Sequence, residues 1–210
     1  MSESGDSDLT LRGLIHDLNN VFQTILDAAD LLAQDPKWAS LAANIERTAE
    51  RGHRLSHSIS EATRSTFPLN VISEIAVQFS RDYLHATKHH PIEFQSDIPA
   101  NLRIRGNPVA WERILVNLFL NSAQAMPCGG WVKLSAHAEG AKATIHLEDN
   151  GPGIPTEILP RIFEPHFSTK PANSGLGLHI VKSLVELDGG VVTAHNRPEG
   201  GASFVIEARC

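Results

Sequence analysis

Two asparagines lie four residues apart in the segment NLFLNSAQAM (117–126). If this segment is helical, the amide groups of Asn117 and Asn121 project from the same face. Amide oxygens are acceptable ligands for Mg²⁺, which prefers oxygen and keeps several waters. The pair therefore predicts a magnesium site, although a solvated polar helix face would show the same spacing.

A carboxylate and two glycines follow a predicted strand in LEDNGPGIP (147–155). Asp149 stands where the strand ends, and its carboxylate can accept a hydrogen bond from an exocyclic amine. Gly151 and Gly153 allow the backbone to approach a planar ring closely. Taken alone, the same stretch could also be a tight turn without a ligand.

A second glycine pair opens a predicted helix in NSGLGLHIVKSLVEL (173–187). Backbone N–H groups and the helix dipole at a helix N-terminus favour a phosphate chain. Gly175, Leu176 and Gly177 are therefore candidate phosphate-binding residues. A loop that only needs glycine would look the same.

The segment IFEPHFSTKPANSG (162–175) is irregular and carries two phenylalanines and a lysine. It predicts a mobile flap in which Phe163 and Phe167 dock on the core while Lys170 reaches a phosphate. An ordinary surface loop is the alternative.

The first part of the chain has the apolar spacing of a helical bundle, alternating between three and four residues. One seam runs through Leu11, Ile15, Leu18, Phe22, Ile25, Ala29 and Leu32, and the other through Trp38, Leu41, Ile45, Thr48, Gly52, Leu55, Ile59 and Ala62. Residues 9–65 therefore predict a helical hairpin, interrupted at QDPK (34–37). Because two helices cannot enclose their own core, we expect a homodimer in which two hairpins form a four-helix bundle.

The second part of the chain alternates between helical and strand patterns. Helices are predicted near 70–88, 108–126 and 175–188, and strands at IEFQSDI (92–98), LRIR (102–105), WVKLSAHA (131–138), ATIHLED (143–149), VVTAHN (191–196) and ASFVIEA (202–208). The predicted fold is therefore α+β, with a helical hairpin over 1–66 and an α/β sandwich over 67–210. In the sandwich, helices cover one face of a mixed sheet.

The composition is that of a soluble globular protein. The chain has 210 residues, 41% of them hydrophobic, and a net charge of −6, which gives no electrostatic reason to bind nucleic acid. No stretch approaches the ~20 apolar residues of a membrane span, and no signal peptide is apparent, so we expect a cytoplasmic protein. Cys128 and Cys210 are not spaced as a metal site and are expected to be reduced thiols.

In this order, the motifs resemble those of the histidine kinases of two-component signalling. The matching segments are HDLNN (16–20) for the H-box, NLFLNSAQA (117–125) for the N-box, DNGPG (149–153) for the G1 box, FEPHF (163–167) for the F-box and GLGL (175–178) for the G2 box. The resemblance covers nearly the whole chain. It implies a dimerisation and histidine phosphotransfer hairpin over 1–66 and an ATP-binding domain of the Bergerat type over 67–210.

The resemblance also implies a role for each motif residue in binding ATP and Mg²⁺. The implied ligands are Asp149 for the adenine amino group with Gly151 and Gly153 in its loop, Asn117 and Asn121 for magnesium and phosphates, Gly175, Leu176 and Gly177 for the phosphate chain, and Lys170 for the γ-phosphate. Relatives that hydrolyse ATP carry a glutamate where this chain has Asn117. Since asparagine is a poor base, transfer to a side chain is favoured over hydrolysis.

The H-box implies the phosphate acceptor. His16 lies outside the first seam, so we expect its imidazole to face solvent. Asp17 is the family's partner for the other ring nitrogen, which makes the free nitrogen more nucleophilic. Asn20 matches the residue that in relatives orients a water for the reverse reaction. We therefore predict a kinase that autophosphorylates His16, transfers the phosphoryl group to an aspartate of a response regulator receiver domain, and can also act as its phosphatase.

Two other functions are compatible with parts of this pattern. One is an ATP-independent histidine phosphotransferase that relays phosphate between receiver domains, although such proteins usually have eroded G-boxes. The other is a binding module in which the nucleotide is only a conformational ligand. The sequence shows no sensor, so we expect a separate sensor protein to supply the signal; a constitutive kinase and an excised core are the alternatives. The H-box reads NNVFQ (19–23), without the proline that commonly follows the second asparagine, so the choice of regulator is not inherited.

Overall fold

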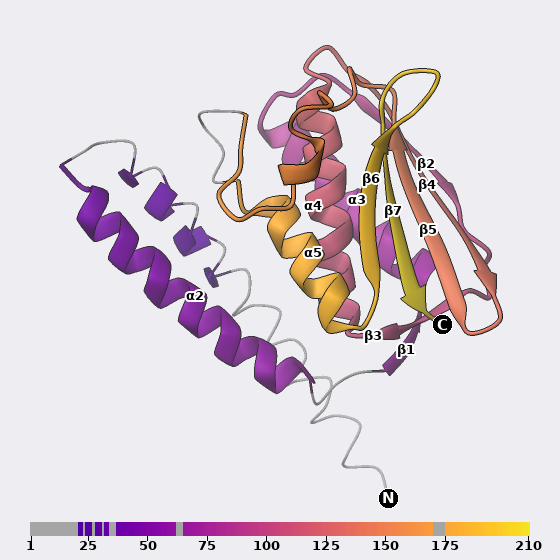
Figure 1. Cartoon of the computed structure of the whole chain (residues 1–210), viewed down its shortest axis with the longest axis horizontal. Coiled ribbons are helices and arrows are strands. Elements are labelled where there is room, and N and C mark those ends of the chain that lie inside the picture. The colour runs from indigo at the N-terminus through magenta and orange to yellow at the C-terminus, as the bar shows by residue number, and fades with distance from the viewer. Residues whose placement is uncertain are drawn as a thin grey trace, which may run out of the picture. The chain divides into compact units, whose positions relative to one another are not determined.

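The computed structural model describes residues 21, 22, 24–26, 28–30, 32, 33, 37–61, 65–169 and 175–210. The chain divides into two compact units (Figure 1). The described residues up to Glu61 belong to one unit and those from Ser65 onward to the other.

The described part of the N-terminal unit is mostly helical. The described residues between 21 and 33 are in helical conformation, and α2 spans Ala39–Glu61. Its buried apolar residues are Leu26, Ala29, Ala42 and Ala49. The two helical segments touch where a Cβ built on Gly52 would lie 2.5 Å from Cζ of Phe22. Small residues on α2 therefore allow a close helix approach.

Several large residues of the predicted seams remain exposed in the single chain. Trp38 is 41% exposed and Leu41 is 47% exposed, although Ala42 beside them is buried. These side chains are apolar surface that a second chain would have to cover. The dimeric four-helix bundle stays a prediction, and the seam residues before position 21 lie outside the described residues.

The C-terminal unit is built on a mixed sheet. Its described strands are β1 (Ser65–Pro68), β2 (Ile92–Asp97), β3 (Arg103–Gly106), β4 (Gly130–Glu139), β5 (Lys142–Asp149), β6 (Val191–Asn196) and β7 (Ala202–Arg209). Five of them form a sheet in the order β2-β4-β5-β7-β6, in which β2 and β4 are parallel and the other neighbours are antiparallel. Strands β1 and β3 form a separate antiparallel ribbon.

Helices cover one face of this sheet (Figure 1). They are α3 (Leu69–Ala86), α4 (Pro108–Ala125) and α5 (Gly177–Leu187), and a short 3-10 helix, η1, spans Leu159–Arg161. Along β5, Ile145 and Leu147 are buried while the alternate residues His146 and Glu148 are only partly buried. This period of two places the core between the sheet and the helices and leaves the other sheet face to solvent. The predicted mixed sheet with helices on one face is confirmed.

Helix α4, which carries the two predicted magnesium ligands, has a well-defined start. The Oδ1 of Asn107 accepts hydrogen bonds from the backbone N–H groups of Val109 (2.9 Å) and Ala110 (3.3 Å). Pro108 occupies the first helical position, where its missing N–H costs nothing. The cap fixes where the helix begins and therefore which residues face the sheet.

The described residues include no helix with the length and apolar content needed to cross a membrane. Cys128 is exposed, Cys210 is partly buried, and neither forms a disulfide.

Candidate functional site

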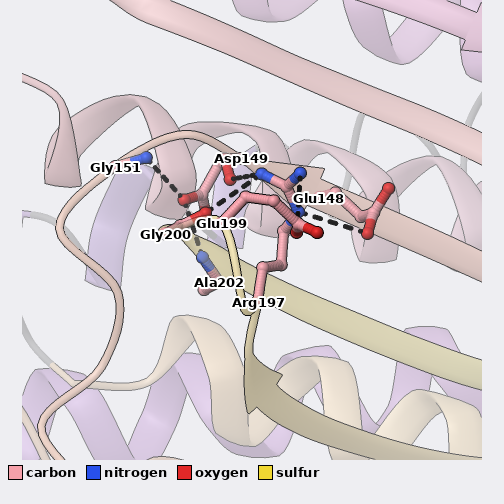
Figure 2. Close-up of polar contacts among 7 residues, drawn as sticks. All are labelled: Glu148, Asp149, Gly151, Arg197, Glu199, Gly200 and Ala202. Carbon is pink, nitrogen blue, oxygen red and sulfur yellow. Dashed lines mark hydrogen bonds and ion pairs between the residues drawn. The ribbon is translucent and has the colours of Figure 1, made fainter.

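Asp149 ends β5 and is buried, with 3% of its surface exposed. Its Oδ1 accepts two backbone hydrogen bonds, one from the N–H of Gly151 and one from the N–H of Ala202, both 3.0 Å long (Figure 2). Both contacts fall on the same oxygen, so within the described part of the chain Oδ2 is left without a donor. A carboxylate fixed through one oxygen presents the other in a defined direction, where it can accept a hydrogen bond from an amino group.

The loop after Asp149 is held at its far end by Asn196, the last residue of β6. The Asn196 side chain accepts from the Ile154 N–H through Oδ1 and donates to the Ile154 carbonyl through Nδ2, both at 2.7 Å. Gly153 has a φ of +78°, and a Cβ on it would lie 2.8 Å from Asn196 Oδ1. Glycine is therefore required here both for its backbone conformation and for space.

The near end of the same loop packs against α4. A Cβ on Gly151 would lie 3.1 Å from Cγ of Met126, the residue that follows α4. The close approach predicted for Gly151 and Gly153 is thus, in this structure, an approach to protein side chains. The helix with the paired asparagines forms one wall of the loop.

The paired asparagines lie on α4, as predicted. Nδ2 of Asn117 donates to the carbonyl of Arg113 at 2.8 Å, and a Cβ built on Gly177 would lie 3.1 Å from Asn117 Oδ1. The amide oxygen is therefore turned toward the N-terminus of α5. Asn121 lies one turn further along α4 and is partly exposed. The structure thus brings the first asparagine and the second glycine pair together.

The N-terminus of α5 has the features of an anion site. Leu176 is the N-cap residue, and no side-chain hydrogen bond from the described residues caps the helix there. Gly175 has a φ of +70°, and a Cβ on it would overlap the backbone of His166 and Phe167, at 2.6 and 2.7 Å. Backbone N–H groups at the positive end of an eleven-residue helix attract phosphate oxygens.

The predicted flap is anchored by its aromatic residues. Phe163 and Phe167 both pack against the hydrophobic core, which confirms their predicted docking. The guanidinium of Arg161 lies 4.7 Å from the centre of the Phe167 ring. Nδ1 of His179, in the first turn of α5, lies 3.3 Å from the carbonyl oxygen of Phe163. These contacts join the described part of the flap to the helix that it precedes.

Four predicted site residues cannot be placed. His16, Asp17 and Asn20 of the H-box and Lys170 of the flap lie outside the described residues. Their roles stay predictions.

A magnesium ion would have amide ligands rather than a carboxylate or histidine cluster. The described residues contain no group of three or more His, Cys, Asp or Glu side chains that could hold a metal. A site formed by asparagine oxygens, phosphate oxygens and water does not need such a group. The Asn117 oxygen is suited to be a magnesium ligand because it is the NH₂ end of the amide that donates to the Arg113 carbonyl.

Residues 106–209 match the family model described as "Histidine kinase-, DNA gyrase B-, and HSP90-like ATPase". Together with the fold, this match shows that residues 106–209 of the C-terminal unit are similar to the ATPase domains of this description. The catalytic domain of the histidine kinase ThkA has the same fold, with a TM-score of 0.62 and 26% identity over 70% of this chain and 95% of that one.

Similarity to histidine kinases extends over most of the sequence. The chain is 30% identical over 206 residues to the sensor histidine kinase ZraS of Klebsiella oxytoca, covering 92% of this chain and 44% of the relative. It is also 30% identical over 219 residues to the sensor kinase CckA of Brucella abortus (strain 2308), covering 92% and 23%. The chain therefore spans less than half the length of these relatives. The fold of full-length ShkA, solved in complex with AMPPNP, is similar with a TM-score of 0.59 and 22% identity over 95% of this chain and 45% of that one.

The role of the turn between β6 and β7 was not predicted from the sequence. Three residues in and beside this turn hold the Asp149 loop: Asn196 at the end of β6, Arg197 in the turn and Ala202 at the start of β7. The segment NRPEGGA (196–202) carried a signal, because proline and two glycines between strands indicate a tight turn. Its contact with Asp149 could not be read from the sequence, since the two segments are about fifty residues apart.

Proposed function

We propose that this chain is an ATP-dependent histidine kinase that phosphorylates its own His16 and passes the phosphoryl group to an aspartate of a response regulator. The observation that carries the proposal is the carboxylate of Asp149, fixed through one oxygen and open at the other. Met126, directly after α4, lies against the loop of this carboxylate, and Asn117 of α4 lies near Gly177 at the start of α5. Similarity to sensor histidine kinases supports the same reading.

The adenine amino group, the phosphates and the magnesium ion each have a proposed partner in the C-terminal unit. Oδ2 of Asp149 would accept a hydrogen bond from the adenine amino group. The backbone N–H groups at the start of α5 would bind phosphate oxygens, with Lys170 contacting the γ-phosphate. Asn117 and Asn121 would hold Mg²⁺ through their amide oxygens, and the ion would neutralise charge on the phosphates.

In the transfer step, a ring nitrogen of His16 attacks the γ-phosphorus. A nitrogen–phosphorus bond forms, the bond from the γ-phosphorus to the bridging oxygen breaks, and ADP leaves with that electron pair. Asp17 would accept the proton from the other ring nitrogen and so make the attacking nitrogen a better nucleophile. The phosphorylated imidazole then donates the phosphoryl group to the carboxylate of a receiver domain.

The reverse activity would use the same helix. Asn20 lies four residues after His16 in the sequence and could orient a water toward the phosphorylated aspartate of the regulator. The chain would then remove the phosphoryl group that it had supplied.

The proposed assembly is a cytoplasmic homodimer that receives its signal from a separate sensor protein. The exposed apolar residues of the N-terminal unit support the dimer: Val21, Ile25, Trp38 and Leu41.

The test is autophosphorylation with ATP labelled at the γ-phosphate. The wild-type chain should acquire a label that is stable in base and labile in acid, and His16→Gln should abolish it. His57→Gln, in the second helix of the same unit, is the matched control and should keep the label. Label that persists in His16→Gln would refute the assignment of the acceptor. A chain that binds no ATP but accepts phosphate from a receiver domain would be an ATP-independent phosphotransferase instead.

A further inference from the structure

We infer that Arg197 is a positioning residue which sets the preference of this site for adenine over guanine nucleotides. It would do so by fixing the backbone at the end of β5, and with it the position of the Asp149 side chain. The inference rests on the proposed function, in which Asp149 binds the adenine amino group.

The Arg197 guanidinium is hydrogen-bonded to the backbone at the end of β5 (Figure 2). Its Nη1 donates to the Asp149 carbonyl at 2.9 Å and to the Gly200 carbonyl at 3.1 Å. One end of the guanidinium therefore ties the peptide that follows Asp149 to the turn between β6 and β7. A hydrogen bond from a charged donor is stronger than one between neutral groups.

The rest of the guanidinium is held as well. Its Nε lies 3.3 Å from the carboxylate of Glu148 and its Nη2 lies 3.7 Å from that of Glu199. The guanidinium carbon is 4.8 Å from the centre of the Trp131 ring. The arginine side chain is only 16% exposed. A planar group that is fixed by several contacts and partly desolvated has a defined orientation, and it transmits that orientation to the Asp149 backbone.

The turn itself completes the support. The Ala202 N–H donates to Asp149 Oδ1 at 3.0 Å. Gly201 has a φ of +91°, and a Cβ on it would overlap the Asp149 carbonyl group. The turn thus contacts both the backbone and the side chain of Asp149. The Arg197 side chain links the turn to the Asp149 carbonyl.

Adenine and guanine differ at the position that such a carboxylate reads. Adenine carries an amino group there, which donates to a carboxylate oxygen, whereas guanine carries a carbonyl oxygen, which is repelled by it. The discrimination depends on the distance and direction of Oδ2, so it should fall if Asp149 can shift. Loss of Arg197 would therefore weaken ATP binding more than GTP binding.

The experiment compares ATP and GTP dissociation constants in full-length Arg197→Met. We expect ATP affinity to fall about tenfold, as for loss of a charged hydrogen bond, and the ATP-to-GTP affinity ratio to fall by a factor of about five or more. A merely structural role would reduce the folded fraction and weaken both nucleotides alike. A folded variant in which the ATP-to-GTP affinity ratio is unchanged, because binding of both nucleotides is weakened equally or not at all, would overturn the inference.

Two further variants separate charge from geometry. Arg197→Lys keeps the positive charge but cannot make the same set of contacts, so it should also lose most of the discrimination. Full rescue by lysine would contradict a positioning role. Arg103→Met is the matched control, because Arg103 also donates to a backbone carbonyl, that of Thr66 at 2.6 Å, in the β1–β3 ribbon. It should leave the ratio unchanged.

Hydrogen exchange without nucleotide tests the positioning directly. In Arg197→Met the backbone N–H groups of Gly151 and Ala202, which donate to Asp149, should exchange faster than in the wild type. Unchanged exchange would overturn the inference. If the wild-type chain bound neither nucleotide, the proposed function would fail. The hydrogen-exchange rates would still show whether Arg197 orders Asp149.

Discussion

At the scale of single residues, the most specific contact proposed for this site is that of Asp149 with the adenine amino group. Asn in its place keeps the size and can still accept from Gly151 and Ala202 through its single oxygen. The other end then carries an NH₂ group, which donates where the carboxylate accepted. We expect Asp149→Asn to bind ATP about a hundredfold more weakly, since it loses a charged hydrogen bond and gains an unpaired donor. Calorimetric titration with ATP would measure this.

The control is a second carboxylate of the same unit. Asp188 follows α5 and accepts a hydrogen bond from Nε1 of Trp111 at 3.2 Å. Asp188→Asn should lower thermal stability without a specific effect on nucleotide binding. Equal ATP affinities in Asp149→Asn and the wild type would show that Asp149 is not the adenine partner.

Gly177 tests the contact between α4 and the start of α5. In Gly177→Ala the new methyl group would lie 3.1 Å from Asn117 Oδ1, closer than an ordinary van der Waals contact. Alanine is the better helix former, by up to about 1 kcal/mol, so the free energy of unfolding should not fall. We expect MgATP affinity to fall about tenfold, by loss of a hydrogen bond or ligand contact to a charged group.

The measurement pairs chemical unfolding with nucleotide titration in magnesium and in a chelator. The loss should be larger in magnesium, because the methyl group crowds a proposed ligand oxygen. A variant that binds MgATP as the wild type does would exclude this crowding.

At the scale of elements, α4 lies between the two halves of the proposed nucleotide site, and its start is fixed by Asn107. Asn107→Ala removes the oxygen that accepts from Val109 and Ala110. We expect a loss of about 1 kcal/mol in the free energy of unfolding. Such a loss corresponds to roughly 2–4 °C in the melting temperature of a chain of this size.

Asn107→Ser is the matched control, because serine can also cap and should restore most of the stability. Both variants should bind ATP normally once folded, because the cap lies at the far end of the helix from Met126. A large loss of ATP affinity in Asn107→Ala at a temperature where it is folded would mean that the cap shapes the site itself.

Elements with strong periodicity could be predicted from the sequence. The strands of the main sheet alternate in burial, and ATIHLED (143–149) matches β5 apart from its first residue. β1 was not predictable because STFP (65–68) has only four residues and ends in proline. The motif residues could be identified from the sequence, but the contacts that hold them in place could not. Contacts such as Arg197 to Asp149 depend on strand order, which no local pattern encodes.

At the scale of the whole molecule, the proposed function assigns the two units to different steps. The C-terminal unit has the residues that would bind ATP, whereas the proposed acceptor His16 belongs to the helical unit. Phosphorylation as proposed would therefore require that ATP bound to one unit reach His16 of the other, in the same chain or in a second copy. A dimer of the helical units would offer both routes.

The last prediction concerns that dimer. Leu41 of α2 is 47% exposed in the single chain, and a lysine there would introduce charge into the predicted bundle. Leu41→Lys should shift the protein from dimer to monomer in light scattering, with ATP affinity unchanged. The matched control is Val71→Lys on α3, which is 43% exposed but lies in the ATP-binding unit, and it should stay dimeric. A wild-type chain that is monomeric at micromolar concentration would contradict the predicted bundle, and a dimer disrupted only by Val71→Lys would place the contact in the other unit.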